Sequence, residues 1–223
     1  MREGYKKQLE ALHTGIIRMG ALCEDAIECA AKGLLDESRP YREKALRLKG
    51  EVEANKREIE EICIRLLLRE QPVASDLRRI TSAQMIVTDM ERIGDQAANI
   101  ARISSFMIGS SVKSDIHIED MSRATVKMLS DSVDSFVAGD LSKARSVIVY
   151  DDVVDDLFDW IRSDLIGIVS NDSAKSEACF NLLMISKYLE RIGDHSANIA
   201  EWVVYSITGK RKRFYDPGSQ ING

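Results

Sequence analysis

The chain has 223 residues, of which 44% are hydrophobic and 30% charged, so it has enough apolar material for a core and too much for a disordered chain. No apolar run reaches the roughly 18 residues that a membrane-spanning helix needs, and we expect no secretory signal, because the first residues turn amphipathic at once. The net charge of −5 argues against a nucleic-acid partner, since binding to a phosphate backbone depends on clustered Lys and Arg.

From the N-terminus onward, apolar residues recur at intervals of three and four, as in Leu9, Leu12, Ile16 and Met19. This spacing is typical of amphipathic helices, and no segment alternates strictly as a half-buried strand would. The three prolines fall between the periodic segments, where we expect connections. In chain order, the pattern predicts helices near residues 5–35, 41–70, 75–108, 115–138, 141–169 and 175–208.

The four cysteines show no paired spacing and lie among apolar neighbours, which indicates neither a disulfide framework nor a metal site. We interpret them as small buried residues in a reducing compartment, the cytoplasm. They are Cys23, Cys29, Cys63 and Cys179.

One segment occurs twice in the chain. It reads ERIGDQAANIA at residues 91–101 and ERIGDHSANIA at residues 190–200, and only the sixth and seventh positions differ. Each copy falls in the third of three predicted helices, which indicates an internal duplication. We therefore predict an all-α fold of two tandem three-helix bundles with six long antiparallel helices. The first repeat covers residues 1–110, the second covers 111–209, and residues 210–223 form a basic, flexible tail.

Each copy of the repeated segment carries a line of oxygen-bearing side chains. Helical residues four apart lie one above the other, about 6 Å apart along the axis. The simplest interpretation is a solvated acidic edge opposite the core. Against it, no Lys or Arg interleaves the line, and its third member is a neutral oxygen donor in both copies. The two lines are Glu91, Asp95 and Asn99, and Glu190, Asp194 and Asn198.

A second acidic cluster lies in the fifth predicted helix, where five aspartates fall within residues 151–159. A divalent or trivalent cation would remove their mutual repulsion, and hard cations prefer oxygen ligands. If the fifth and sixth helices pack antiparallel, this cluster meets Glu190 and Asp194. In the first half the corresponding region is interrupted by Lys49, Lys56 and Arg57, so a weaker site is expected there. The candidate metal ligands, for Fe, Zn, Mn or Mg, are Glu91, Asp95, Asn99, Glu190, Asp194, Asn198, Asp151, Asp152, Asp155 and Asp156.

Two other functions are weighed against a metal-binding regulator. A carboxylate-bridged metalloenzyme would need two Glu-x-x-His pairs, and only Glu10 and His13 have that spacing. His195 is replaced by Gln96 in the other copy, and we interpret it as a helix-surface residue. Nucleophile and nucleotide-binding motifs are absent from the sequence, so we expect no catalytic residues and no enzyme. A metal-free helical interaction module stays open.

The doubled Glu-Arg-Ile-Gly-Asp segment resembles the PhoU family, accessory proteins of high-affinity phosphate transport. The resemblance extends over residues 5–209 and includes residues 71–78 and 199–210. It implies two three-helix bundles side by side, usually as a homodimer. It also implies metal sites of Glu/Asp-x-x-x-Asp spacing, which map onto Glu91 with Asp95, Glu190 with Asp194, Asp151 with Asp155, and Asp152 with Asp156.

The same resemblance implies a function. Members of this family are regulators without known catalytic turnover. They restrain phosphate uptake and hold the phosphate-starvation response off when phosphate is plentiful. The partners implied are the ATPase subunit of the phosphate transporter and a sensor histidine kinase.

Overall fold

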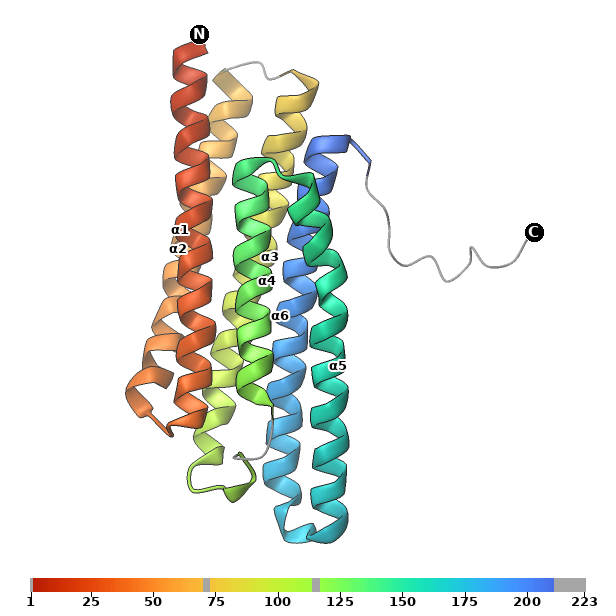
Figure 1. The fold of residues 1–223 in the computed structure, drawn as a ribbon. Helices are drawn as coiled ribbons and strands as arrows, with labels where there is room; N and C mark the ends of the chain where they lie inside the picture. Colours follow the sequence, from red (N-terminus) through yellow and green to blue (C-terminus); the bar gives the residue numbers. More distant parts are fainter. Residues whose placement is uncertain (1, 70–72, 114–116, 211–223) are drawn as a thin grey trace, which may run out of the picture.

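The computed structural model of the protein describes residues 2–69, 73–113 and 117–210 and consists of long helices (Figure 1). The helices are α1 (Arg2–Leu35), α2 (Arg39–Arg69), α3 (Ala74–Ile103), α4 (Ile118–Ala138), α5 (Leu141–Asn171) and α6 (Ser176–Thr208). Short 3-10 turns follow α3 at Ser104–Met107 and Ser111–Lys113, and precede α6 at Ser173–Lys175. The described residues contain no strand, so the predicted all-α class is confirmed.

The helices form two three-helix bundles that lie side by side. Helices α1, α2 and α3 pack on one another, and α4, α5 and α6 do the same. The bundles meet where α3 packs on α6 and α1 packs on α4. This leaves α2 and α5 at the two outer edges of the molecule (Figure 1). The predicted pair of three-helix bundles is therefore confirmed.

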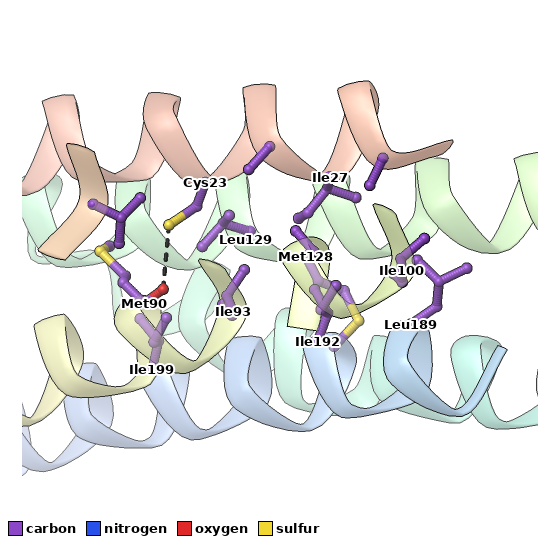
Figure 2. Packing of buried hydrophobic residues seen from close by; sticks show 14 of the residues in the cluster. Cys23, Ile27, Met90, Ile93, Ile100, Met128, Leu129, Leu189, Ile192 and Ile199 are labelled. Carbon is purple, nitrogen blue, oxygen red and sulfur yellow. Dashed lines mark hydrogen bonds between the residues drawn. The ribbon is translucent and has the colours of Figure 1, made fainter. Parts of the chain in front are cut away.

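One continuous core joins the two bundles. Figure 2 shows Cys23 of α1, Ile93 of α3, Leu129 of α4 and Ile192 of α6 around a shared interior, and all four side chains are fully buried. The Cys23 thiol donates a hydrogen bond to the Met90 carbonyl at 3.3 Å. Burying each large aliphatic side chain contributes about 1.5–3 kcal/mol, so the shared interior holds the repeats together as one unit. All four cysteines are free and buried, as predicted.

Helix ends follow the local sequence with two corrections. Gly139 ends α4 in the left-handed region with φ 67°, and the Asp140 carboxylate begins α5 by accepting a hydrogen bond from Lys143 N at 2.9 Å. Pro40 does not separate two helices, because it lies in the first turn of α2, where a missing N–H costs nothing. Helix α3 ends at Ile103 and not near residue 108, because a 3-10 turn begins at Ser104. The predicted flexible tail from residue 211 onward lies outside the described residues.

A polar contact crosses the interface between the repeats. His195 Nδ1 on α6 lies 3.0 Å from Asp89 Oδ1 on α3, and these side chains are 15% and 8% exposed. The interpretation of His195 as a helix-surface residue is therefore wrong. The face of α6 that carries His195 packs on α3, and the buried Asp89 carboxylate takes the ring as its partner.

We expect His195→Gln to lower the free energy of unfolding by about 1–3 kcal/mol, because the buried Asp89 carboxylate loses its imidazole partner. Denaturant unfolding at neutral pH measures the change. The matched control is His117→Gln, since His117 makes a similar 3.0 Å contact with Asp120 but both side chains are half exposed. That control should change the free energy by less than about 0.5 kcal/mol. Equal effects of the two substitutions would contradict a structural role for the buried pair.

Candidate metal centre

The acidic residues of the second repeat meet across the contact between α5 and α6. Asp151 and Asp155 of α5 face Glu190 and Asp194 of α6 closely enough for the charges of these two α6 residues to raise the pKa values of both α5 aspartates. Gly193 permits this approach, because a Cβ at that position would lie only 3.1 Å from Asp151 Oδ1. The predicted meeting of the two acidic segments is therefore present in the structure.

Burial and like charge raise the pKa values of three carboxyl groups in this cluster, those of Asp151, Asp155 and Asp194. Desolvation, followed by the charges of Asp194, Asp155, Asp152 and Glu190, raises the pKa of Asp151 to about 7. The pKa values of Asp155 and Asp194 are raised as well, each first by desolvation and then by the charge of Glu190. Within the described part of the chain, Asp151, Asp155 and Asp194 make no hydrogen bond or ion pair. The cluster therefore carries repulsion that a cation would relieve.

Lys187 lies beside this cluster, and Arg191 and His195 also lower the pKa of Asp194. Lys187 pairs with Glu190 one turn along α6, and its Nζ lies 5.1 Å from the centre of the Phe158 ring. Its charge lowers the pKa of Asp194 and Asp155, but less than burial raises them. One lysine thus compensates only part of the charge of the two aspartates and one glutamate around it.

In the first repeat, lysines neutralise the corresponding acidic residues. Lys49 Nζ lies 3.2 Å from Asp95 Oδ1, and Lys56 Nζ lies 2.6 Å from Glu91 Oε2. Asn99 Oδ1 accepts a hydrogen bond from Arg102 at 2.7 Å. Each of the three predicted ligands of the first repeat therefore already has a basic partner. This geometry supports the expectation that any metal site in the first repeat is the weaker one.

The equivalence of α2 and α5 explains the difference between the repeats. A Cβ on Gly94 would meet Val52 at 3.4 Å, and a Cβ on Gly193 would meet Val154 at 3.2 Å, so the two valines occupy the same place. Counting from these valines along each helix, Lys49 corresponds to Asp151. The position that neutralises the repeated aspartate in one repeat thus adds a further negative charge in the other. The sequence contains this signal, but only after the two helices are aligned by their buried positions.

The structure does not bring every candidate ligand to one place. Helical geometry turns Asp152 and Asp156 further toward the outer face of α5 than Asp151 and Asp155, although the charge of Asp152 still raises the pKa of both. Asn198 is half-buried on α6. Across the described ranges, no three His, Cys, Asp or Glu side chains converge in a geometry that holds a metal ion. The donor chemistry of Asp151, Asp155, Glu190 and Asp194 suits a hard cation, but their carboxylates would have to draw together around it. The metal ligands therefore remain a prediction.

The fold and the doubled segment together define a class of protein: a duplicated three-helix repeat that packs into one six-helix unit. Nothing in the described helices is apolar enough over sufficient length to cross a bilayer. The profile of the PhoU domain matches residues 16–104 and residues 118–203, one stretch in each repeat. The chain belongs to the PhoU family.

Relatives and solved structures agree with that assignment. The phosphate-specific transport system accessory protein PhoU homolog of Clostridium acetobutylicum is 36% identical, over 94% of this chain and 97% of the relative. The homolog of Pseudomonas aeruginosa is 32% identical, over 92% of this chain and 86% of the relative. The crystal structure of PhoU from Pseudomonas aeruginosa superposes with a TM-score of 0.87. It is 32% identical, and the match covers 92% of this chain and 100% of that chain. The crystal structure of the phosphate transport system regulatory protein PhoU from Streptococcus pneumoniae superposes with a TM-score of 0.85. It is 26% identical and the match covers 93% of this chain and 99% of that chain.

We expect the stability of the cation-free protein to fall as the pH rises from about 4 to about 7, because Asp151 loses its proton over this range. The folded state holds the Asp151 proton up to about pH 7, above the usual 3.8 of an unfolded aspartate, so it binds more protons over that range. Asp151→Asn should remove the share of this decline that Asp151 contributes, leaving that of Asp155 and Asp194, and should raise the free energy of unfolding at pH 8. After discounting for solvent screening of a half-buried group, the gain should be about 1–2 kcal/mol.

Denaturant unfolding at several pH values in chelated buffer measures this effect. The control is Asp164→Asn, an exposed aspartate on the same helix, which should leave the pH dependence unchanged. An unchanged decline in Asp151→Asn would show that the Asp151 carboxylate is not the strained group.

Proposed function

We propose that this chain is a non-catalytic, metal-binding regulator of phosphate transport that restrains high-affinity phosphate uptake and phosphate-starvation signalling. The observation that carries the proposal is the match over almost the whole chain to proteins named as accessory or regulatory components of phosphate transport systems. The fold also supports a regulator, because its long helices offer extended surfaces for partners.

A bound cation is the proposed means of fixing the second repeat. Asp151 and Asp155 on one helix and Glu190 and Asp194 on the next would hold Fe, Zn, Mn or Mg between α5 and α6. The raised pKa values of Asp151, Asp155 and Asp194 support this idea, since they mark carboxylates that gain from a nearby positive charge. Binding would draw the two helices together and set the shape of the outer face of α5.

The proposed partners are the ATPase subunit of the phosphate transporter and a sensor histidine kinase, met by a homodimer in the cytoplasm. The names of the relatives support a transporter partner, since those proteins are accessories of a transport system. The kinase and the dimer rest on the family resemblance alone. Each of these interactions would use helix surfaces outside the shared core.

The Asp194→Asn and Asp95→Asn pair tests the cation site, because the two aspartates occupy the same place in the two repeats. Adding Mn²⁺, Mg²⁺, Zn²⁺ or Fe²⁺ singly to chelated wild-type protein should raise its melting temperature for at least one ion. Asp194→Asn should lose that rise, whereas Asp95→Asn should keep most of it, since Asp95 already pairs with Lys49. Elemental analysis gives the number of ions bound. A wild type that responds to none of the ions would contradict the metal site.

The same variants test the regulatory function in cells that lack the native gene. In phosphate-rich medium, uptake of radiolabelled phosphate should rise in the deletion strain and return to normal with the wild-type gene. Asp194→Asn should restore restraint less well than Asp95→Asn. Unchanged uptake in the deletion strain would contradict the proposed regulator, whereas equal restoration by both variants would contradict only the role of the metal.

A further inference from the structure

An apolar stripe runs along the outer face of α5. Val149, Val153 and Trp160 are 69%, 40% and 59% exposed, and helical geometry places them within about 40° of one another around the axis. The ring of His117, at the start of α4, lies 6.3 Å from the Trp160 ring. We call Val149, Val153 and Trp160 the α5 stripe.

The first repeat shows that the fold does not require this stripe. Counting from the equivalent valines Val52 and Val154, the positions of the α5 stripe correspond on α2 to Arg47, Glu51 and Glu58. The same scaffold thus carries three charged side chains at one edge of the molecule and three apolar ones at the other. Exposed apolar surface of this kind marks an interaction site when neither the core nor the helix needs it.

The surroundings of the α5 stripe define the charge of what would bind there. Asp152 and Asp156 are exposed along its flank toward α6. On the side toward α4, Lys127 is already paired with Asp131 and lies 4.9 Å from the Tyr150 ring. The flank beside Val153 and Trp160 is therefore negative and favours a partner that brings positive charge there, whereas Arg145 and Lys210 lie at the Val149 end.

A hollow lies at one end of the stripe. Val149 lines it together with Ile148 and with Val204 of α6, and its volume is about 570 Å³. Arg145, Glu201 and Lys210 also line it. The apolar part of this hollow is large enough for an anchoring side chain from a partner that lies along α5.

We propose that the α5 stripe docks an amphipathic helix of a partner protein, with its apolar side chains on Val149, Val153 and Trp160 and flanking Lys or Arg beside Asp152 and Asp156. The inference rests on the proposed regulatory function, since it names the chemistry of a partner of that regulator. An anionic membrane is disfavoured, because the same aspartates repel it. An antiparallel pair of α5 helices from two copies is disfavoured too, because it sets these aspartates against each other.

The probe is a synthetic helical peptide of about 18 residues, with leucines along one face and lysines on both flanks. Its binding to the full chain is measured by calorimetry, and the control peptide has glutamate in place of every lysine. The lysine peptide should bind the wild type at least about tenfold more tightly, and the difference should shrink as salt is added. Equal binding of the two peptides, or binding of neither, would overturn the proposal.

Protein variants locate the surface. The double variant V153E/W160E should weaken the lysine peptide by at least about tenfold. The matched control is I64E/L68E, which replaces two exposed apolar residues of α2 and should leave the affinity unchanged. Melting temperatures confirm that both variants fold, since all four positions are exposed. Loss of binding in both variants, or in neither, would contradict docking on α5.

Two further measurements test whether a second copy of the chain or a membrane, and not a partner helix, binds the α5 stripe. A monomer–dimer shift in V153E/W160E by light scattering would assign the stripe to a second copy and overturn the proposal. Stripe-dependent binding of vesicles of phosphatidylglycerol would likewise assign it to a membrane. The phosphate-uptake test is independent of these results. If the lysine peptide does not bind while deletion of the gene still raises phosphate uptake, the docking proposal is wrong and the regulatory function is supported. If the peptide binds but deletion does not change uptake, the docking surface is supported and the regulatory function is wrong.

Discussion

The packing of α3 on α6 is the contact on which the rest of the molecule depends. It joins the two copies of the repeated segment through buried residues such as Ile93 and Ile192, and it places the Asp89–His195 pair inside the interface. Because α3 and α6 occupy the centre, α2 and α5 are left at the outer edges with one face in solvent. The two outer edges are therefore equivalent places of the two repeats, and their surfaces can be compared position by position.

Those edges have different chemistry on the same backbone. On the first, Lys49 and Lys56 neutralise the repeated acidic residues, and the outer face of α2 is charged. On the second, Asp151 stands where Lys49 stands, and the outer face of α5 carries the exposed apolar α5 stripe beside Asp152 and Asp156. The duplication thus supplies a stable frame, while the substitutions on α5 concentrate uncompensated carboxylates and an exposed apolar stripe in one repeat. Our proposals for cation binding and for partner docking both fall on that repeat.

The sequence was sufficient for the features that depend on periodicity. Apolar spacing predicted six helices, the doubled segment predicted two bundles, and the aspartates of residues 151–159 were expected to meet Glu190 and Asp194. It was insufficient where a property depends on which faces meet. His195 was assigned to the surface because Gln96 replaces it in the other copy, and its partner Asp89 lies in the other repeat, where the spacing does not reveal it. Which of these aspartates face α6 also depends on the rotation of α5 about its axis, which spacing alone does not give.

The central claim is that the position shared by Lys49 and Asp151 decides whether a repeat needs a cation. The most direct measurement is the free energy of unfolding of Asp151→Lys, with and without added divalent cation. A lysine there should meet Asp194 as Lys49 meets Asp95. The variant should then be more stable than the wild type in chelated buffer and should no longer respond to the cation. A variant that is less stable in chelated buffer, or that keeps the cation response of the wild type, would contradict this account.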